Sequence, residues 1–183
     1  MDQPILHTKR LVLRPFEDDD AAAVLRLAGD KAIADTTQNI PHPYEDGMAE
    51  SWIGGHNERL RQGHLAFAIA LRAPNSLVGT IGIRIDASSR QAELGYWIGV
   101  PFWNKGYATE AASRLIEYGF DDLTLNRIAA RHFTRNPASG RVMQKIGMIH
   151  EGTLRQGALK GERFEDLELY AILHSDWLAL RHE

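Results

Sequence analysis

The chain has 183 residues, and its 44% of hydrophobic and 25% of charged residues are typical of a folded globular protein, which argues against disorder. This length predicts one domain spanning residues 1–183, large enough to bury a core without a disulfide or metal. The absence of cysteine excludes disulfide scaffolds, thiolate zinc sites and a cysteine nucleophile. The net charge of −3 offers no basic surplus for nucleic acid, and no apolar run approaches the roughly 20 residues of a membrane span. We therefore expect a cytoplasmic protein that binds neither nucleic acid nor a membrane.

Periodicity and turn residues predict a chain that contains both strands and helices. Alternating polar and apolar residues predict strands, and apolar residues three and four positions apart predict helices. The predicted elements, in chain order, are a strand at 10–14, helices at 21–28 and 44–62, strands at 65–71, 77–85 and 91–99, a helix at 108–120, a strand at 127–133, a helix from Asn136 to Gly147, strands at 148–158 and 163–173, and a helix at 175–180. Short connections predict antiparallel hairpins, whereas the strand–helix–strand segment over 91–133 requires a parallel pair. The expected fold is a mixed-sheet α/β or α+β domain.

The segment that carries most chemical information joins the strand at 91–99 to the helix at 108–120. Gly106 and Ala108 are small, so a ligand can approach the backbone closely there. A helix N-terminus exposes unpaired N–H groups and a partial positive charge, which suit an anion such as a pyrophosphate. The glycine spacings of the Walker A loop and of the dinucleotide-binding fingerprint are both absent. The residues alone therefore predict an anion site without naming the anion.

This segment resembles the acetyl-CoA pyrophosphate loop of the GNAT superfamily of N-acetyltransferases. The family pattern is Gln/Arg-x-x-Gly-x-Gly/Ala, and the run that matches it, with Trp in the first place, is Trp103-Asn104-Lys105-Gly106-Tyr107-Ala108. Its continuation through Thr109 and Glu110 is similar to the Rim-type branch, which acetylates the N-termini of ribosomal proteins. The segments that extend the similarity over residues 8–178 are residues 8–14, Asn136-Pro137-Ala138-Ser139 with Arg141, Lys145 and Gly147, residues 151–155 and residues 166–173.

The resemblance implies a fold and a co-substrate. It implies a twisted sheet of about seven mostly antiparallel strands with helices on both faces, and a central parallel pair, here 91–99 and 127–133, that splays apart. Pantetheine of acetyl-CoA would lie in the gap, with a bulge expected at Ile98-Gly99, and no metal is implied. The residues that the resemblance assigns to acetyl-CoA are Trp97, Ile98, Gly99, Asn104, Lys105, Gly106, Tyr107, Ala108, Thr109, Asn136, Ser139 and Arg141.

The implied reaction is direct attack of a primary amine on the thioester. An α-amino group has a pKa of about 8 and a lysine amine of about 10.4, so a protein N-terminus needs only a weak base. Glu93, which shares a strand face with Gly95 and Trp97, is the candidate base. Ser139 matches the branch's general acid. We expect an N-acetyltransferase for a protein N-terminal α-amine, with a small-molecule amine as the alternative acceptor.

Plainer interpretations stay open beside these. Glu93 could be a salt-bridged surface carboxylate, and Ser139 could serve only as a helix-start residue. Arg127, Arg131 and Arg135 fit a salt-bridged face, whereas Arg141 and Lys145 could meet the 3′-phosphate of CoA. The eight histidines show no metal-ligand spacing. A non-catalytic CoA-binding module and a nucleotide-binding protein remain alternatives to an enzyme, and either a monomer or a homodimer is expected.

Overall fold

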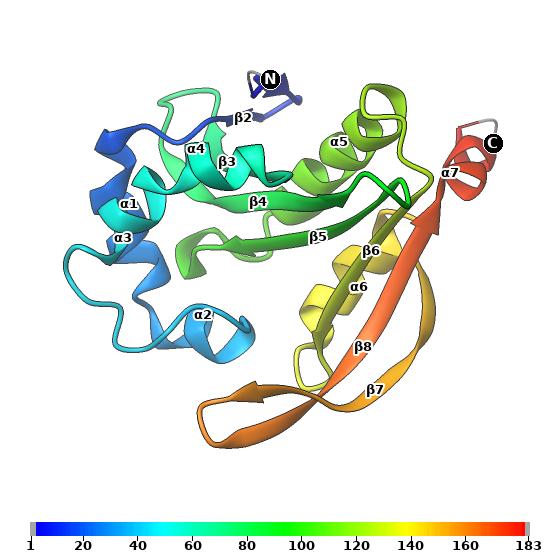
Figure 1. The fold of residues 1–183 in the computed structure, drawn as a ribbon. Helices are drawn as coiled ribbons and strands as arrows, with labels where there is room; N and C mark the ends of the chain where they lie inside the picture. Colours follow the sequence, from blue (N-terminus) through cyan, green and yellow to red (C-terminus); the bar gives the residue numbers. More distant parts are fainter. Residues whose placement is uncertain (1–2, 182–183) are drawn as a thin grey trace.

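The computed structural model describes residues 3–181, which are built around one sheet of eight strands (Figure 1). The sheet order is β1-β2-β3-β4-β5-β6-β8-β7, and β5 with β6 is its parallel pair. The strands are β1 (Leu6–His7), β2 (Leu11–Arg14), β3 (His64–Leu71), β4 (Leu77–Asp86), β5 (Gln91–Ile98), β6 (Arg127–Phe133), β7 (Ile149–Lys160) and β8 (Arg163–Leu173). The predicted mixed sheet with a central parallel pair is confirmed. It has eight strands rather than about seven because short β1 pairs with β2 at one edge. The expected domain, 1–183, includes two residues at each end that lie outside the described residues.

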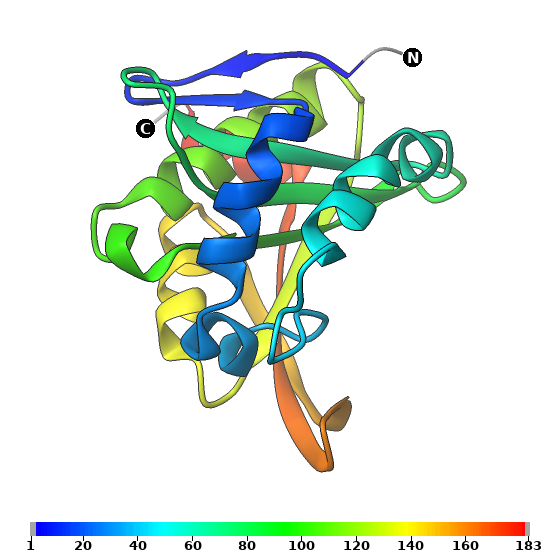
Figure 2. The same cartoon turned by 90° about the vertical axis from the view of Figure 1, so that its left-hand side faces the viewer.

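Helices cover both faces of the sheet (Figures 1 and 2). They are α1 (Ala21–Ala28), α2 (Lys31–Thr36), α3 (Met48–Gly54), α4 (His56–Arg61), α5 (Tyr107–Asp121), α6 (Pro137–Lys145) and α7 (His174–Leu180), with 3-10 turns η1 (Asp18–Asp20) and η2 (Val100–Phe102). The single helix predicted at 44–62 is wrong. It divides at Gly55 into α3 and α4, and a Cβ there would meet the Arg59 guanidinium. Helix α2 was not predicted, and Asp30 caps it by accepting from Ala32 N–H at 2.8 Å.

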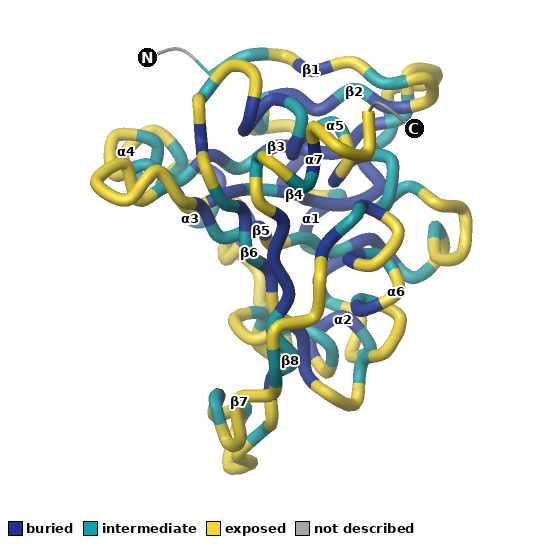
Figure 3. The backbone as a smooth tube through the Cα atoms, turned by 90° about the vertical axis from the view of Figure 1, so that its right-hand side faces the viewer, coloured by how far each residue is buried: buried dark blue, intermediate teal, exposed yellow. Residues whose placement is uncertain are grey.

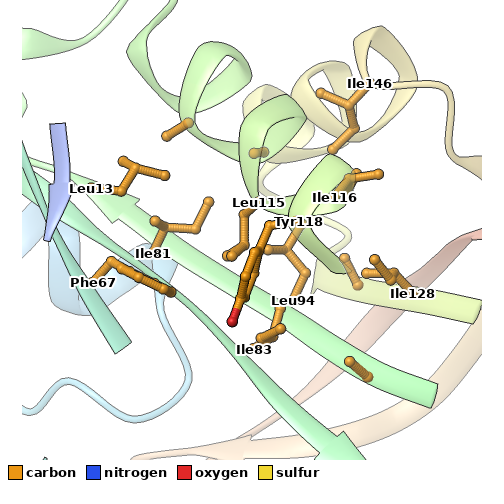
Figure 4. Close-up of a cluster of buried hydrophobic side chains, with 14 of the residues drawn as sticks. Leu13, Phe67, Ile81, Ile83, Leu94, Leu115, Ile116, Tyr118, Ile128 and Ile146 are labelled. Atoms are coloured by element: carbon orange, nitrogen blue, oxygen red, sulfur yellow. The ribbon is translucent and has the colours of Figure 1, made fainter. Parts of the chain in front are cut away.

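Two apolar layers enclose the sheet. Figure 4 shows α5 seated on one face, where Leu115 and Ile116 pack with Ile81, Leu94 and Ile128. On the other face α1 and α3 bury apolar side chains against β3 and β4. The residues of that second layer include Val24, Leu27, Ala49, Ile53, Ala68 and Leu77. Because both layers fix β4 and β5 firmly, the ends of β5 and its neighbours form a rigid frame for a site. No helix within residues 3–181 is both long and apolar enough to cross a membrane.

The β7–β8 hairpin projects from the sheet, and β7 is exposed along most of its length (Figure 3). Two register shifts interrupt its pairing with β8, between His150 and Gly152 and between Leu154 and Ala158. Near the hairpin tip, Lys160 Nζ donates to the carbonyl oxygens of Ile40 at 2.5 Å and Gln38 at 3.5 Å. The hairpin is thereby tied to the loop that follows α2.

A buried ion pair joins β2 to the start of α1. Arg14 Nη1 lies 2.7 Å from Asp20 Oδ2 and Nη2 lies 2.9 Å from Oδ1, with both residues less than 10% exposed. Burial by itself would raise the pKa of Asp20. Hydrogen bonds from Arg14 and from the Glu17 N–H outweigh it, so the pKa lies below its ordinary value.

We expect Asp20→Ala to lower the free energy of unfolding by about 3–5 kcal/mol, because it leaves a buried guanidinium without its partner. The depressed pKa means that the pair stabilises wild type above the unfolded pKa of about 3.9 and loses that effect as the pH falls further. Urea denaturation at pH 7 and pH 3 measures both effects. Asp19→Ala, at an exposed neighbouring position, is the control. A loss under about 1 kcal/mol for Asp20→Ala, within the range of an exposed pair, would contradict this account.

Candidate active site

A gap opens between the two parallel strands at the centre of the sheet. β5 and β6 pair over four residues, from Gln91 opposite Arg127 to Leu94 opposite Ala130. Both strands continue further, and Figure 1 shows them diverging. The predicted bulge at Ile98-Gly99 is wrong, since β5 keeps an unbroken register with β4 through Ile98. The two strands therefore separate without an irregularity in β5, and each stays paired with its outer neighbour, β4 or β8.

A cavity of about 800 Å³ passes through this gap. One side is walled by the first turns of α5 and α6, and the other by α1, α2 and the loop after α2. The predicted site residues that line it are Glu93, Trp97, Ile98, Asn104, Gly106, Tyr107, Ala108, Thr109, Asn136, Ser139 and Arg141. Gly99 and Lys105 do not line it. Predicted residues from three separate stretches of sequence are thus brought to one cavity.

The backbone of β5 presents one predicted donor to the gap. Gly99 N–H donates to the Val78 carbonyl of β4 at 2.9 Å, so it is already engaged. Because successive residues of a strand direct their N–H groups to opposite neighbours, the Ile98 N–H points to the β6 side. The Trp103 indole donates to the Ile98 carbonyl at 2.5 Å. Of Trp97, Ile98 and Gly99, Ile98 is therefore the residue whose amide faces the gap.

The loop before α5 exposes a row of backbone amides to the cavity. Asn104 and Gly106 have left-handed backbone conformations, with φ of 60° and 78°. Gly106 is the N-cap and has no side chain to satisfy the helix start. Within residues 3–181, the N–H groups of residues 106–109 meet no hydrogen-bond acceptor, and Glu110 N–H is the first to bond, to the Gly106 carbonyl at 3.0 Å. The helix start therefore presents unpaired donors to an anion.

A polar cluster at the start of α6 faces the same gap. Asn136 caps the helix by accepting from Ser139 N–H. Tyr96, from β5, places its Oη 2.9 Å from Ser139 Oγ and 3.1 Å from the Ser139 carbonyl oxygen. Burial raises the pKa of Tyr96 to about 12, although the Ser139 hydrogen bond acts in the other direction. Tyr96 is therefore a neutral hydroxyl that can donate to Ser139.

The family model of the Acetyltransferase (GNAT) domain matches residues 10–149. The chain belongs to the GNAT family. It is 34% identical over 176 residues to the N-acetyltransferase YoaA of Bacillus subtilis, which covers 93% of this chain and 97% of that protein. A GNAT-family acetyltransferase structure from Bacillus anthracis has a TM-score of 0.83 at 30% identity, covering 94% and 99% of the two chains. The ribosomal-protein-serine acetyltransferase of Escherichia coli is 29% identical over 116 residues, 63% of this chain and 65% of that protein. The GNAT protein described here is thus an acyltransferase with Rim-type relatives.

Glu93 sits in this GNAT cavity between two guanidinium groups. Arg131 Nε lies 2.7 Å from Oε1, and Arg84 Nη2 lies 2.8 Å from Oε2. The carboxylate is about one third exposed and lines the cavity. An incoming amine that donates a proton to Glu93 would share the carboxylate with these arginines.

The other basic residues of the GNAT site fall into two groups. Arg127 pairs with Glu151 and Arg131 with Glu93, which agrees with the predicted salt-bridged face. Arg141 and Lys145, on α6, line the cavity. They are therefore placed to contact an anionic ligand, whereas Arg127 is engaged by a carboxylate of its own.

Two contacts of the GNAT site were missed in the sequence. Tyr96 was not assigned to the site from the sequence, although its hydroxyl contacts Ser139 across 43 positions of sequence. Arg10 and Glu110, 100 positions apart, meet beside the loop before α5. Tyr96 could have been found from strand periodicity, which places it on the same face of the strand as Leu94 and Ile98. No local signal links Arg10 to Glu110.

Proposed function

We propose that the protein transfers the acetyl group of acetyl-CoA to a primary amine, preferably the α-amine of a protein N-terminus. One observation carries the proposal: the unpaired amides of residues 106–109 open onto a cavity that continues through the strand gap. The diphosphate would bind those amides, and Arg141 and Lys145 would face further phosphate. Pantetheine would extend along β5, where the Ile98 amide faces the gap and can hold the thioester carbonyl.

The reaction would proceed by direct attack. The neutral amine attacks the thioester carbon, and its nitrogen gives up one proton to Glu93 or to water. The C–S bond of the tetrahedral intermediate then breaks and releases CoA as a thiolate. Ser139 would donate a hydrogen bond or proton to that sulfur, while Tyr96 holds the serine hydroxyl. A thiol has a pKa of about 8.5, so near neutral pH the leaving sulfur is stabilised by a proton or a hydrogen bond.

The far side of the cavity favours an acceptor with an apolar surface near its amine. Apart from tyrosines, the ionisable side chains that line the whole cavity are one carboxylate, Glu93, and the cations Arg131, Arg141 and Lys145, beside His132. The apolar and aromatic residues of the acceptor side are Val24, Ile33, Ile40, Tyr44, Trp52, Trp97, Phe133 and Leu167. A polyamine carries several positive charges and would meet too few carboxylates here. A peptide N-terminus carries a single amine of low pKa, which suits a site without a strong base.

We expect Glu93→Gln to lower kcat/KM for the amine at neutral pH, because the amide cannot accept the amine proton. Initial rates at subsaturating amine and saturating acetyl-CoA measure this. Arg84→Gln, which removes one partner of Glu93 and keeps the carboxylate, is the control and should retain most of the rate. An unchanged kcat/KM in Glu93→Gln would show that water or another group accepts the proton.

Acetylation of a matched panel tests the proposed acceptor. The panel contains peptides with a free N-terminus, the same peptides with a blocked N-terminus and an internal lysine, polyamines and single amino acids, each analysed by mass spectrometry with acetyl-CoA. We expect modification at the free α-amine and little at the lysine. Faster acetylation of a small amine would instead support the alternative acceptor. CoA binding without turnover on any amine would support a non-catalytic CoA-binding module.

A further inference from the structure

One cluster of polar contacts beside the loop before α5 has no part in the chemistry above. Glu110, in the first turn of α5, accepts three hydrogen bonds from the turn between β1 and β2. Its Oε1 lies 2.6 Å from Thr8 Oγ1 and 2.8 Å from the Arg10 N–H, and its Oε2 lies 2.6 Å from Arg10 Nε. Burial alone would raise the pKa of Glu110, but these bonds hold it below its ordinary value. The start of α5 is thereby fastened to the opening segment of the chain.

The same arginine continues into the loop. Arg10 Nη1 donates to the Lys105 carbonyl at 2.9 Å, and the guanidinium lies 4.8 Å from the centre of the Tyr107 ring. A Cβ built on Gly106 would lie 3.4 Å from Arg10 Nη2. Arg10 and Lys105 do not line the cavity, whereas Gly106 and Tyr107 do. Arg10 therefore supports the loop from behind.

The geometry of the peptide unit between Lys105 and Gly106 determines the direction in which the Gly106 N–H points. The bond between Lys105 and Gly106 is trans, so its carbonyl and its N–H point in opposite directions. Arg10 holds the Lys105 carbonyl on the side away from the cavity. The Gly106 N–H of the same unit must then point towards the cavity that Gly106 lines.

We propose that Arg10 and Glu110 are positioning residues, which aim the Gly106 amide and the amides after it at the diphosphate of CoA. The inference rests on the proposed function. The loop contains two left-handed residues, Asn104 and Gly106; that conformation costs most residues with a Cβ roughly 1–2 kcal/mol, and asparagine less. Arg10 and Glu110 hold the loop in this conformation before the ligand arrives, which reduces the ordering cost of binding. Because their charges offset each other, the pair acts through geometry and not through net charge.

The direction in which Glu110→Gln changes the CoA affinity distinguishes a role in geometry from a role in charge. Removing the negative charge of Glu110 beside a polyanionic ligand would strengthen CoA binding if charge alone mattered. If Glu110 instead supports the loop before α5, its replacement weakens CoA binding. We expect Glu110→Gln and Arg10→Ala each to weaken CoA binding about tenfold, measured by isothermal titration calorimetry, with kcat at saturating acetyl-CoA changed less than about threefold. Arg10→Lys keeps the cation but not the fork that reaches both partners, so it should not restore affinity.

Controls separate this role from general loss of structure. Arg72 Nη1 donates to the Thr8 carbonyl at 3.3 Å on the same turn and does not touch the loop, so Arg72→Ala should bind CoA as wild type does. S-acetylpantetheine, which lacks the diphosphate, should keep its KM in Glu110→Gln. Unchanged or tighter CoA binding in Glu110→Gln would overturn the inference. An equal rise in KM for acetyl-CoA and for S-acetylpantetheine would overturn it as well. Failure of wild type to bind CoA would instead refute the proposed function.

Discussion

Replacement of Gly106 by aspartate is expected to weaken CoA binding at least about 100-fold. Gly106 has a φ of 78°, a conformation that costs a residue with a Cβ roughly 1 kcal/mol or more. The new carboxylate would also stand among the unpaired amides of residues 106–109. A like charge about 4 Å from a phosphate oxygen costs roughly 4 kcal/mol near a protein surface. That cost alone corresponds to a roughly 1000-fold loss of CoA affinity.

Gly106→Asn is the matched control for this substitution. Asparagine has the shape of aspartate, tolerates the left-handed conformation better than most residues and carries no charge. It should therefore retain most of the CoA affinity, so that the difference between the two variants isolates the charge at the loop. Calorimetric titration with CoA, together with melting curves for both variants, measures this. Wild-type affinity in Gly106→Asp would mean that the diphosphate binds elsewhere.

Ser139→Ala should lower kcat by about 10²–10⁴-fold while leaving the affinity for acetyl-CoA close to that of wild type. The serine hydroxyl faces the strand gap and is held by Tyr96 Oη at 2.9 Å. Its removal leaves the leaving sulfur without a donor but spares the amides of residues 106–109. Steady-state rates at saturating acetyl-CoA, with CoA titrations on the same variant, separate the two effects.

Tyr96→Phe supplies the comparison for Ser139→Ala. Tyr96 is proposed to act through the serine, so the double variant should be no slower than Ser139→Ala alone, a non-additive result. Additive losses would mean that the tyrosine acts independently of the serine. Turnover of Ser139→Ala at the wild-type rate would reduce Ser139 to a residue of the helix start.

Local patterns predicted the fold where an element is long or clearly bounded. The bounds of α1 and β6 were predicted as observed, because an acidic start and a glycine frame the helix and apolar residues alternate in the strand. The short elements β1 and α2 were missed, since two and six residues hold too little periodicity. The bulge expected in β5 is absent, and the gap opens where β5 and β6 stop pairing after Leu94 and Ala130.

The features of the candidate site also divide into those that local sequence patterns predict and those that they do not. The loop before α5 was found from the sequence because Gly106 and the helix start lie within a few residues of each other. The contact of Tyr96 with Ser139 and that of Arg10 with Glu110 join residues 43 and 100 positions apart. Such pairs depend on the sheet order, which places the turn after β1 beside the start of α5. Periodicity describes one element at a time and cannot supply them.

Binding of the diphosphate by the amides at the start of α5 can be observed by titrating the ¹⁵N-labelled protein with CoA and following its backbone amide resonances by NMR. We expect the amide resonances of residues 106–109 to shift strongly with CoA and to remain in place with pantetheine, which lacks the diphosphate. Saturable CoA binding that leaves those four amides unmoved would contradict it.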